Sequence, residues 1–213
     1  MKRFLSILLC GLVALSLTAC GGNEESNTYT ESEITKAQNL QRSTYFSDTG
    51  KFVNSYTGVT VAVPGDWYVC LDEEIALVVL EGSTTGDELS MWTQADFETQ
   101  PIIPDFVVMD TANGNIISVS YENLAVTGAQ GVTGQEYVEK LAKELEGDGC
   151  TVSQPETVTL SGMEFDLVTA TLTKDGAAHS RYIAARRFED YMMVVTSSGE
   201  ESKSPEMFKL FFE

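Results

Sequence analysis

Apolar and polar residues alternate in the last third of the chain, and this alternation is the strongest structural signal in the sequence. The apolar residues that share a strand face form two sets: Met163, Phe165 and Leu167, and then Tyr191, Met193 and Val195. Because successive side chains of a strand point to opposite faces, this spacing predicts strands with one buried face. Short polar turns separate the segments, so we expect an antiparallel meander with strands over 157–160, 163–173, 178–188 and 191–197.

Three further strands are expected earlier in the chain. Residues 59–63 alternate valine with smaller or polar residues and predict a strand that ends at Pro64. Residues 106–109 and 116–121 predict two more strands. Asn113-Gly114 lies between them, and this pair is typical of a tight hairpin turn.

The clearest helix is expected over residues 133–146. Thr133 and Glu136 have the spacing of a capping box, in which each side chain bonds the backbone of the other residue. Gly147 is expected to end the helix in a left-handed conformation. One apolar stripe runs along the helix and consists of Val138, Leu141, Ala142 and Leu145.

Other helical segments are less clearly marked. Residues 71–80 suit either a helix or a buried strand, and we favour the helix because Asp72-Glu73-Glu74 would lie at its positive dipole end. A short helix is expected over 93–97. Ser204-Pro205 predicts the start of a terminal helix that docks on the sheet. Its apolar face consists of Met207, Phe208, Phe211 and Phe212.

The first twenty residues have the order of a secretory signal peptide. A basic start at Met1-Lys2-Arg3 precedes an apolar run, and Leu17-Thr18-Ala19 closes the run with small residues before Cys20. This ending resembles the lipobox of bacterial lipoproteins, in which cleavage falls before the cysteine and the cysteine sulfur carries diacylglycerol. An ordinary signal peptide and an uncleaved anchor are the alternatives, although the apolar run is shorter than the roughly 20 residues of a membrane span.

The sequence therefore predicts three parts. Residues 1–19 form a lipoprotein signal peptide, and residues 20–44 comprise the lipidated Cys20 and an acidic flexible tether. The tether prediction rests on its polar composition, which lacks an apolar period. Residues 45–213 form a single α+β domain, a length that suits one substantial core.

Three features of this domain resemble the PsbP-like fold, which is named for an extrinsic photosystem II protein. They are the strand that runs into a proline turn and tryptophan over Val59–Trp67, the capped helix from Thr133, and the turn over Leu160–Phe165 that leads into the meander. The resemblance implies an antiparallel β-sheet with a C-terminal meander flanked by helices, as an α/β/α sandwich. It also implies a protein that binds partners without catalysing a reaction, as in bacterial lipoproteins of unknown role.

The charge of the chain excludes one class of partner. The chain has 32 acidic and 13 basic residues and a formal net charge of −19 at pH 7. Nucleic acid requires clustered lysine and arginine to neutralise phosphates, so we expect no nucleic-acid partner. Direct binding to anionic lipid is disfavoured for the same reason. We therefore expect diacylglycerol on Cys20 to attach the protein to the membrane. An unknown protein is expected as a further partner.

Two cysteines remain in the expected domain once Cys10 and Cys20 are assigned to the signal peptide and the lipid site. Cys70 and Cys150 could form a disulfide, because disulfides are stable outside the cytosol. The alternative is two separate reduced cysteines, and the sequence alone does not give the geometry that would decide between them.

A local basic group lies on one strand of this acidic chain. His179, Arg181 and Arg187 share one strand face by the period of two, whereas Arg186 points to the other face. This group is a candidate site for an anionic ligand or for the carboxylates of a partner. The alternative, which we favour, is cross-strand ion pairing with Glu164 or Asp166.

The candidate chemistry leaves two functional hypotheses. Neither cysteine stands in a nucleophile motif beside the single histidine, and the acidic clusters lack the spacing of a calcium loop, so we expect no cofactor and no metal. The first hypothesis is a non-catalytic binding or accessory module, lipid-anchored on the extracytoplasmic face of the cell membrane. The alternative is an extracytoplasmic hydrolase whose site is assembled from dispersed residues.

Overall fold

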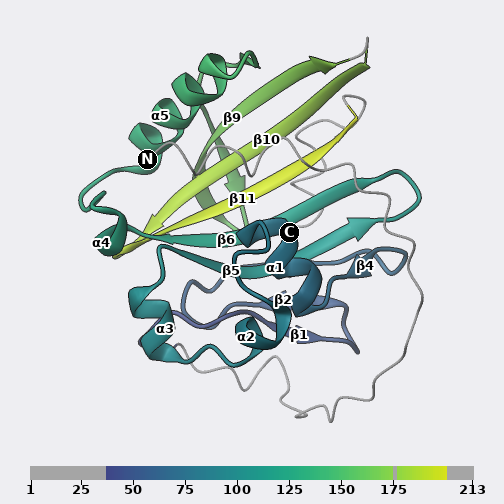
Figure 1. Ribbon diagram of the computed structural model, residues 1–213, viewed down its shortest axis with the longest axis vertical. Coiled ribbons are helices and arrows are strands. Elements are labelled where there is room, and N and C mark those ends of the chain that lie inside the picture. Colours follow the sequence, from purple (N-terminus) through teal and green to yellow (C-terminus); the bar gives the residue numbers. More distant parts are fainter. Residues whose placement is uncertain (1–36, 175–176, 201–213) are drawn as a thin grey trace.

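The computed structural model describes residues 37–174 and 177–200, and Figure 1 shows the arrangement of its elements. Within these residues, one antiparallel sheet has eight strands and a second has three. This confirms the predicted α+β class with an antiparallel sheet and flanking helices. The strands of the large sheet are β4 (Tyr68–Val69), β5 (Ile102–Asp110), β6 (Asn115–Asn123), β7 (Thr151–Val152), β8 (Glu156–Leu160), β9 (Met163–Lys174), β10 (Ala177–Phe188) and β11 (Tyr191–Glu200). The small sheet consists of β1 (Thr44–Phe46), β2 (Lys51–Val53) and β3 (Thr60–Ala62).

The predicted C-terminal meander is confirmed. The large sheet has the order β4-β5-β6-β11-β10-β9-β7, and β8 pairs with β9. Ser161 and Gly162 both have positive φ, 48° and 70°, and form the turn between β8 and β9. β11 pairs with β10 on one side and β6 on the other, which joins the meander to the earlier strands.

The predicted hairpin at Asn113-Gly114 is also confirmed, and it joins β5 to β6. Gly114 has a φ of 69°, a conformation that glycine adopts without steric cost. The register of the hairpin shifts between Pro104 and Phe106, so Asp105 lies in a β-bulge. A bulge redirects side chains locally, and this one places a carboxylate inside the protein.

All of the described helices except α3 cover one face of the large sheet. In Figure 1, α5 lies along β9 and β10, and α1 lies beside β5. Val138 and Leu145 of α5 pack on Ile183, and Ile75 of α1 packs with Val107. The helices are α1 (Asp72–Leu80), α2 (Gly86–Ser90), α3 (Gln94–Thr99), α4 (Leu124–Thr127) and α5 (Gly134–Gly147).

The opposite face of the large sheet packs mainly against the small sheet. Phe52 of β2 stacks on Phe106 of β5 with ring centroids 4.0 Å apart. Val61 of β3 and Phe97 of α3 belong to the same buried cluster. The large sheet therefore has a packed layer on each side.

The helices predicted from the sequence at 71–80 and 133–146 are confirmed, but the predicted end of the second helix is wrong. Residues 72–80 are helical, as favoured, and the N-terminus of α5 has the predicted capping box between Thr133 and Glu136. Gly147, however, remains within the helix, and Gly149 adopts the left-handed conformation with a φ of 88°. The helix therefore continues beyond the expected stop.

The packed part of the chain starts earlier than the expected boundary at Tyr45. Leu40 is only 1% exposed and belongs to the main buried cluster, so packing begins no later than Ala37. Cys20, the signal segment and the helix expected after Ser204 lie outside the described residues. Among the residues that are described, no helix is long and apolar enough to cross a membrane.

Candidate functional site

A small pocket lies where the N-terminal segment, α3 and the β10–β11 turn meet. Its volume is about 170 Å³. Residues 38–40 form one wall, Gln94 and Glu98 of α3 form another, and residues 189–191 form a third, with Tyr56 completing the lining. The lining is largely polar, and we take this pocket as the candidate site.

The first wall is held in place by backbone and amide contacts. The backbone N–H of Ala37 donates to the carbonyl of Ser55 at 3.0 Å. The Asn54 side chain donates from Nδ2 to the carbonyl of Gln41 at 2.8 Å. These two bonds flank residues 38–40, so the wall is fixed at both ends, and the burial of Leu40 anchors it between them.

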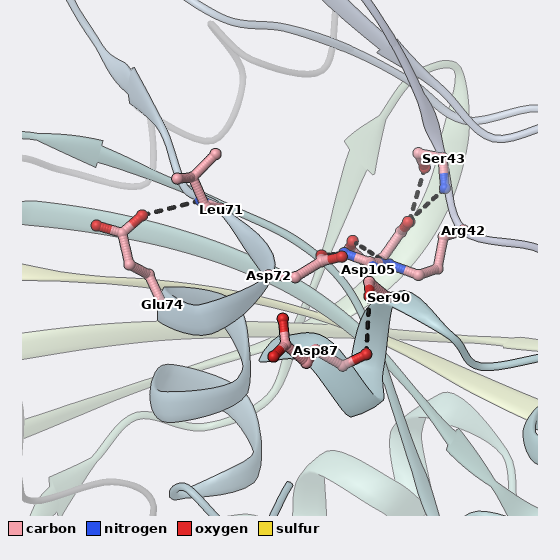
Figure 2. Close-up of polar contacts among 8 residues, drawn as sticks. All are labelled: Arg42, Ser43, Leu71, Asp72, Glu74, Asp87, Ser90 and Asp105. Atoms are coloured by element: carbon pink, nitrogen blue, oxygen red, sulfur yellow. Dashed lines mark hydrogen bonds and ion pairs between the residues drawn. The ribbon is translucent and has the colours of Figure 1, made fainter. Parts of the chain in front are cut away.

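A second set of contacts attaches the same segment to the β5 bulge (Figure 2). The backbone N–H of Ser43 donates to Oδ1 of Asp105 at 2.5 Å, and its hydroxyl donates to Oδ2 at 2.7 Å. Tyr121 donates to Oδ2 at 3.3 Å from within the sheet. Asp105 is only 2% exposed, and its burial raises the pKa of the carboxyl despite these donors. We call Ser43, Asp105 and the neighbouring Arg42 the N-terminal clasp.

Arg42 extends the clasp to α1. Its Nε donates to the Asp105 carbonyl at 3.0 Å, and its NH2 forms an ion pair with Asp72 at 2.7 Å. Asp72 is the first residue of α1, and the Leu71 N–H donates to the Glu74 carboxylate at 2.8 Å to cap the helix (Figure 2). The N-terminal segment, the bulge and the start of α1 therefore form one connected polar unit.

The third wall is the turn between β10 and β11. Glu189 has a φ of 51°, which is uncommon for a residue other than glycine. Arg187 donates from Nε to the Glu189 carbonyl at 2.7 Å, and the N–H of Leu124 donates to the Asp190 carbonyl at 2.8 Å. These contacts hold the backbone of the turn while the Glu189 and Asp190 side chains stay exposed.

Two tyrosines connect this turn to the rest of the pocket. Tyr56 donates from its hydroxyl to Oε2 of Glu189 at 3.1 Å, and the Tyr56 and Tyr191 rings meet edge to face with centroids 6.2 Å apart. Burial raises the pKa of Tyr56, and the Glu189 carboxylate adds to the rise. Burial also raises the pKa of Tyr191, with further contributions from Glu98 and Asp190. Both hydroxyls therefore stay protonated at neutral pH.

The pocket is lined by groups that can bind a ligand. Its lining supplies three carboxylates, three carboxamides and two tyrosines. Across the described residues, no group of three or more histidine, cysteine or acidic side chains is placed to hold a metal ion. The arrangement can accept hydrogen bonds and place carboxylates around a ligand.

The two cysteines that the sequence singles out lie apart from this pocket. Both Cys70 and Cys150 are free, and they belong to different buried clusters, beside α1 and α5 respectively. Burial raises the pKa of Cys70 to about 12, and it also raises the pKa of Cys150. Thiols of this kind are poor nucleophiles at neutral pH.

His179 and Cys150 do not form a catalytic pair. Thr151, which follows Cys150, pairs with Thr171 of β9, and His179 of β10 pairs with Leu172 of β9. β9 therefore separates the two residues, which places their backbones about 10 Å apart. A nucleophile and its base need direct hydrogen-bond contact.

The basic residues of β10 divide between the two sheet faces as expected. Arg186 lies over the Phe188 ring at 5.4 Å and donates to the Glu164 carbonyl at 2.6 Å, on the face opposite Arg187. Arg181 is half-buried, and its burial lowers the pKa of the guanidinium to about 10. Binding of an anionic ligand by His179, Arg181 and Arg187 stays a prediction.

Some exposed apolar side chains lie in the region of α1 and α2. Leu71 and Leu77 of the α1 region are 66% and 51% exposed, and Met91 at the end of α2 is 69% exposed. α1 and α2 pack against each other.

Sequence reasoning missed the pocket. Its walls come from short polar segments that the sequence separates widely, and Glu189-Asp190 is recognisable there only as a turn. Gln38 and Asn39 fall in the segment expected to be a tether. No periodicity or motif connects them, so only the folded arrangement brings them together.

No known protein-family model matches the chain, and no curated protein matches it. Among solved structures, the chain is similar to LpqN of Mycobacterium tuberculosis, described as involved in cell envelope biogenesis, with 11% identity and a TM-score of 0.40 over 86% of this chain and 91% of LpqN. It is also similar to a protein of Bacteroides thetaiotaomicron, with 7% identity and a TM-score of 0.37 over 71% of this chain and 42% of that protein, less than half its length. Neither similarity assigns a fold family or a function, so the PsbP-like resemblance stays a prediction.

Proposed function

We propose that the protein is a lipid-anchored binding or accessory module on the extracytoplasmic face of the cell membrane. The observation that carries this proposal is the order of the first twenty residues, in which a basic start, an apolar run and Leu17-Thr18-Ala19 precede Cys20. Acyl chains on Cys20 would hold the protein at the membrane, where two chains suffice for stable attachment.

The folded part supports a binding role through two features. The pocket presents acceptor groups and tyrosines, and the hydrogen bonds of Ala37 and Asn54 hold residues 38–40 in place as one of its walls. The surface around Leu71, Leu77 and Met91 offers apolar area to a partner. Both features are suited to the recognition of a ligand or a partner.

Mass spectrometry of the mature protein tests the anchor. We expect the N-terminal peptide to begin at Cys20 and to carry the mass of a diacylglycerol and its acyl chains. The Cys20→Ala variant should leave the membrane fraction, whereas Cys150→Ala, a matched change in the folded part, should stay in it. An unmodified Cys20 on mature protein, or equal membrane retention of Cys20→Ala, would contradict the proposal.

A further inference from the structure

We propose that the pocket binds an organic cation, namely an ammonium or guanidinium group on a short aliphatic chain. The proposal adds a ligand class to the binding function proposed above and rests on it. The two proposals can be refuted independently. The mass of the Cys20 peptide tests the lipid anchor, whereas ligand affinity tests the pocket.

The charges around the pocket have a single sign. Glu98, Glu189 and Asp190 line it, and none of its lining residues is basic. Within the described residues, none of the three carboxylates forms an ion pair. A cationic group entering the pocket would therefore meet three carboxylates that lack a cationic partner, which favours its binding.

The two arginines nearest to Glu189 in the sequence bind backbone carbonyls and not the pocket carboxylates. Arg187 uses Nε to bind the carbonyl of Glu189, and its side chain is not part of the pocket lining. Arg186 binds the Glu164 carbonyl and lies over the Phe188 ring. The protein therefore uses these two arginines to support the strand and the turn, and the pocket carboxylates remain available to a ligand.

The tyrosines favour an organic cation over an inorganic one. Ring faces attract ammonium and guanidinium groups, and both Tyr56 and Tyr191 line the pocket. The carboxylates, by contrast, are not grouped closely enough to form a metal site among the described residues. Hydrogen bonding also favours an organic cation. The carboxylate and carboxamide oxygens of the lining can accept hydrogen bonds from its several N–H donors.

The size of the pocket limits the ligand. About 170 Å³ is below the roughly 300 Å³ at which pockets for drug-sized ligands begin. It is similar to an engineered cavity of about 150 Å³ that admits benzene, so a head group of about six heavy atoms fits. The charged head of a lysine or arginine side chain has this size, and so does a small free amine.

The exposure of the carboxylates predicts weak, salt-sensitive binding. Glu98, Glu189 and Asp190 are all exposed, so water and salt screen their attraction. A few such contacts with one ring contact correspond to a dissociation constant on the order of 1 mM at low ionic strength. Removal of one carboxylate should weaken binding about two- to fivefold.

Calorimetric titration of the full chain in detergent tests the proposal. The probes are N-acetyl-lysine amide, N-acetyl-arginine amide and n-butylammonium, with N-acetyl-norleucine amide as the uncharged analogue. We expect the three cations to bind and the uncharged analogue to bind at least tenfold more weakly. Tighter binding of the amino-acid amides would favour a basic side chain of a partner, and tighter binding of butylammonium would favour a free amine; either result supports the cation site.

A charge-matched pair of variants separates the pocket from the general acidity of the chain. The triple variant Glu98→Gln, Glu189→Gln, Asp190→Asn should lose about tenfold or more in affinity. The control removes three exposed carboxylates from the end of α5: Glu144→Gln, Glu146→Gln and Asp148→Asn. Its affinity should be unchanged.

Tyr191→Leu provides an independent variant that keeps every carboxylate, and it should weaken binding about two- to fivefold. Unfolding midpoints confirm that each variant is folded. Equal losses in the two triple variants, equal binding of the uncharged analogue, or absence of cation binding to the folded full chain would overturn the proposal.

Discussion

The N-terminal clasp leads to a prediction whose size follows from the structure. Ser43→Ala removes the hydroxyl that donates to Oδ2 of Asp105 at 2.7 Å and leaves the backbone bond of Ser43 to Oδ1 in place. The remaining donor to Oδ2 is Tyr121, at the longer distance of 3.3 Å. The substitution thus leaves a buried carboxylate oxygen with one weaker donor.

The expected loss of stability depends on the charge of Asp105. A hydrogen bond to a charged group contributes about 1.5–3 kcal/mol, and one between neutral groups contributes about 0.5–1.5 kcal/mol. We expect Ser43→Ala to lower the free energy of unfolding by about 2 kcal/mol if Asp105 is ionised and by about 1 kcal/mol if it is protonated. With a typical urea m value of about 2 kcal/mol/M, the larger loss moves the midpoint by about 1 M.

Ser90→Ala is the matched control for this measurement. Ser90 also donates a hydroxyl hydrogen bond, to the Asp87 carbonyl at 2.8 Å, but this bond is exposed (Figure 2). Exposed substitutions of this kind change stability by about 0.5 kcal/mol or less. Urea unfolding at constant m should separate the two variants, and a Ser43→Ala loss no larger than that of Ser90→Ala would refute the role of the clasp.

Three further predictions concern other parts of the fold. Burial raises the folded-state pKa of Asp105, so the stability that its proton contributes is present below the unfolded pKa of about 3.9 and is lost as the pH rises through the folded pKa. The stability of wild type relative to Asp105→Asn should therefore fall in urea titrations as the pH is raised above about 4, and a constant difference would contradict this. Gly86→Ala should cost about 1–3 kcal/mol because its Cβ would lie 2.5 Å from the Glu73 nitrogen, whereas Gly65→Ala, with open space around its Cβ, should cost much less; equal midpoints would contradict the packing. Alkylation at pH 8 with mass analysis should modify Cys150 before Cys70, whose pKa is raised to about 12; faster modification of Cys70 in folded protein would be the contrary result.

Much of the sheet was predictable because its strands are long and their turns are strongly marked. β9, β10 and β11 are each ten or more residues long, and β9 and β11 begin with apolar residues that recur at every second position. The Thr133–Glu136 capping box likewise located α5. Local signals sufficed in these places because tertiary packing reinforces them.

The small sheet was partly missed because its strands are short. β1 and β2 have three residues each, too few for a period to be recognised, although Phe46 and Phe52 are buried. Leu40 was likewise a single apolar residue in a polar segment. Its burial depends on contacts with strands far along the chain, which no local pattern reveals.

The candidate site was the least predictable part, because long-range contacts build it. Tyr56 and Glu189 are 133 positions apart in the sequence and form a direct hydrogen bond. Asp105 resembles an ordinary polar residue within a strand segment, and only the bulge turns it inward to Ser43. Side chains of this kind acquire their roles from tertiary structure.

The most direct test of a binding role for the pocket is to map a ligand on the full chain. In a nuclear magnetic resonance titration with N-acetyl-lysine amide, we expect saturable shifts of the backbone amides of residues 38–40, Glu98 and 189–191, reduced by added salt. Amides of α5 should not shift. Saturable shifts centred on α5 or on the surface around Leu71 and Met91, or no saturable shifts at the pocket, would contradict the account.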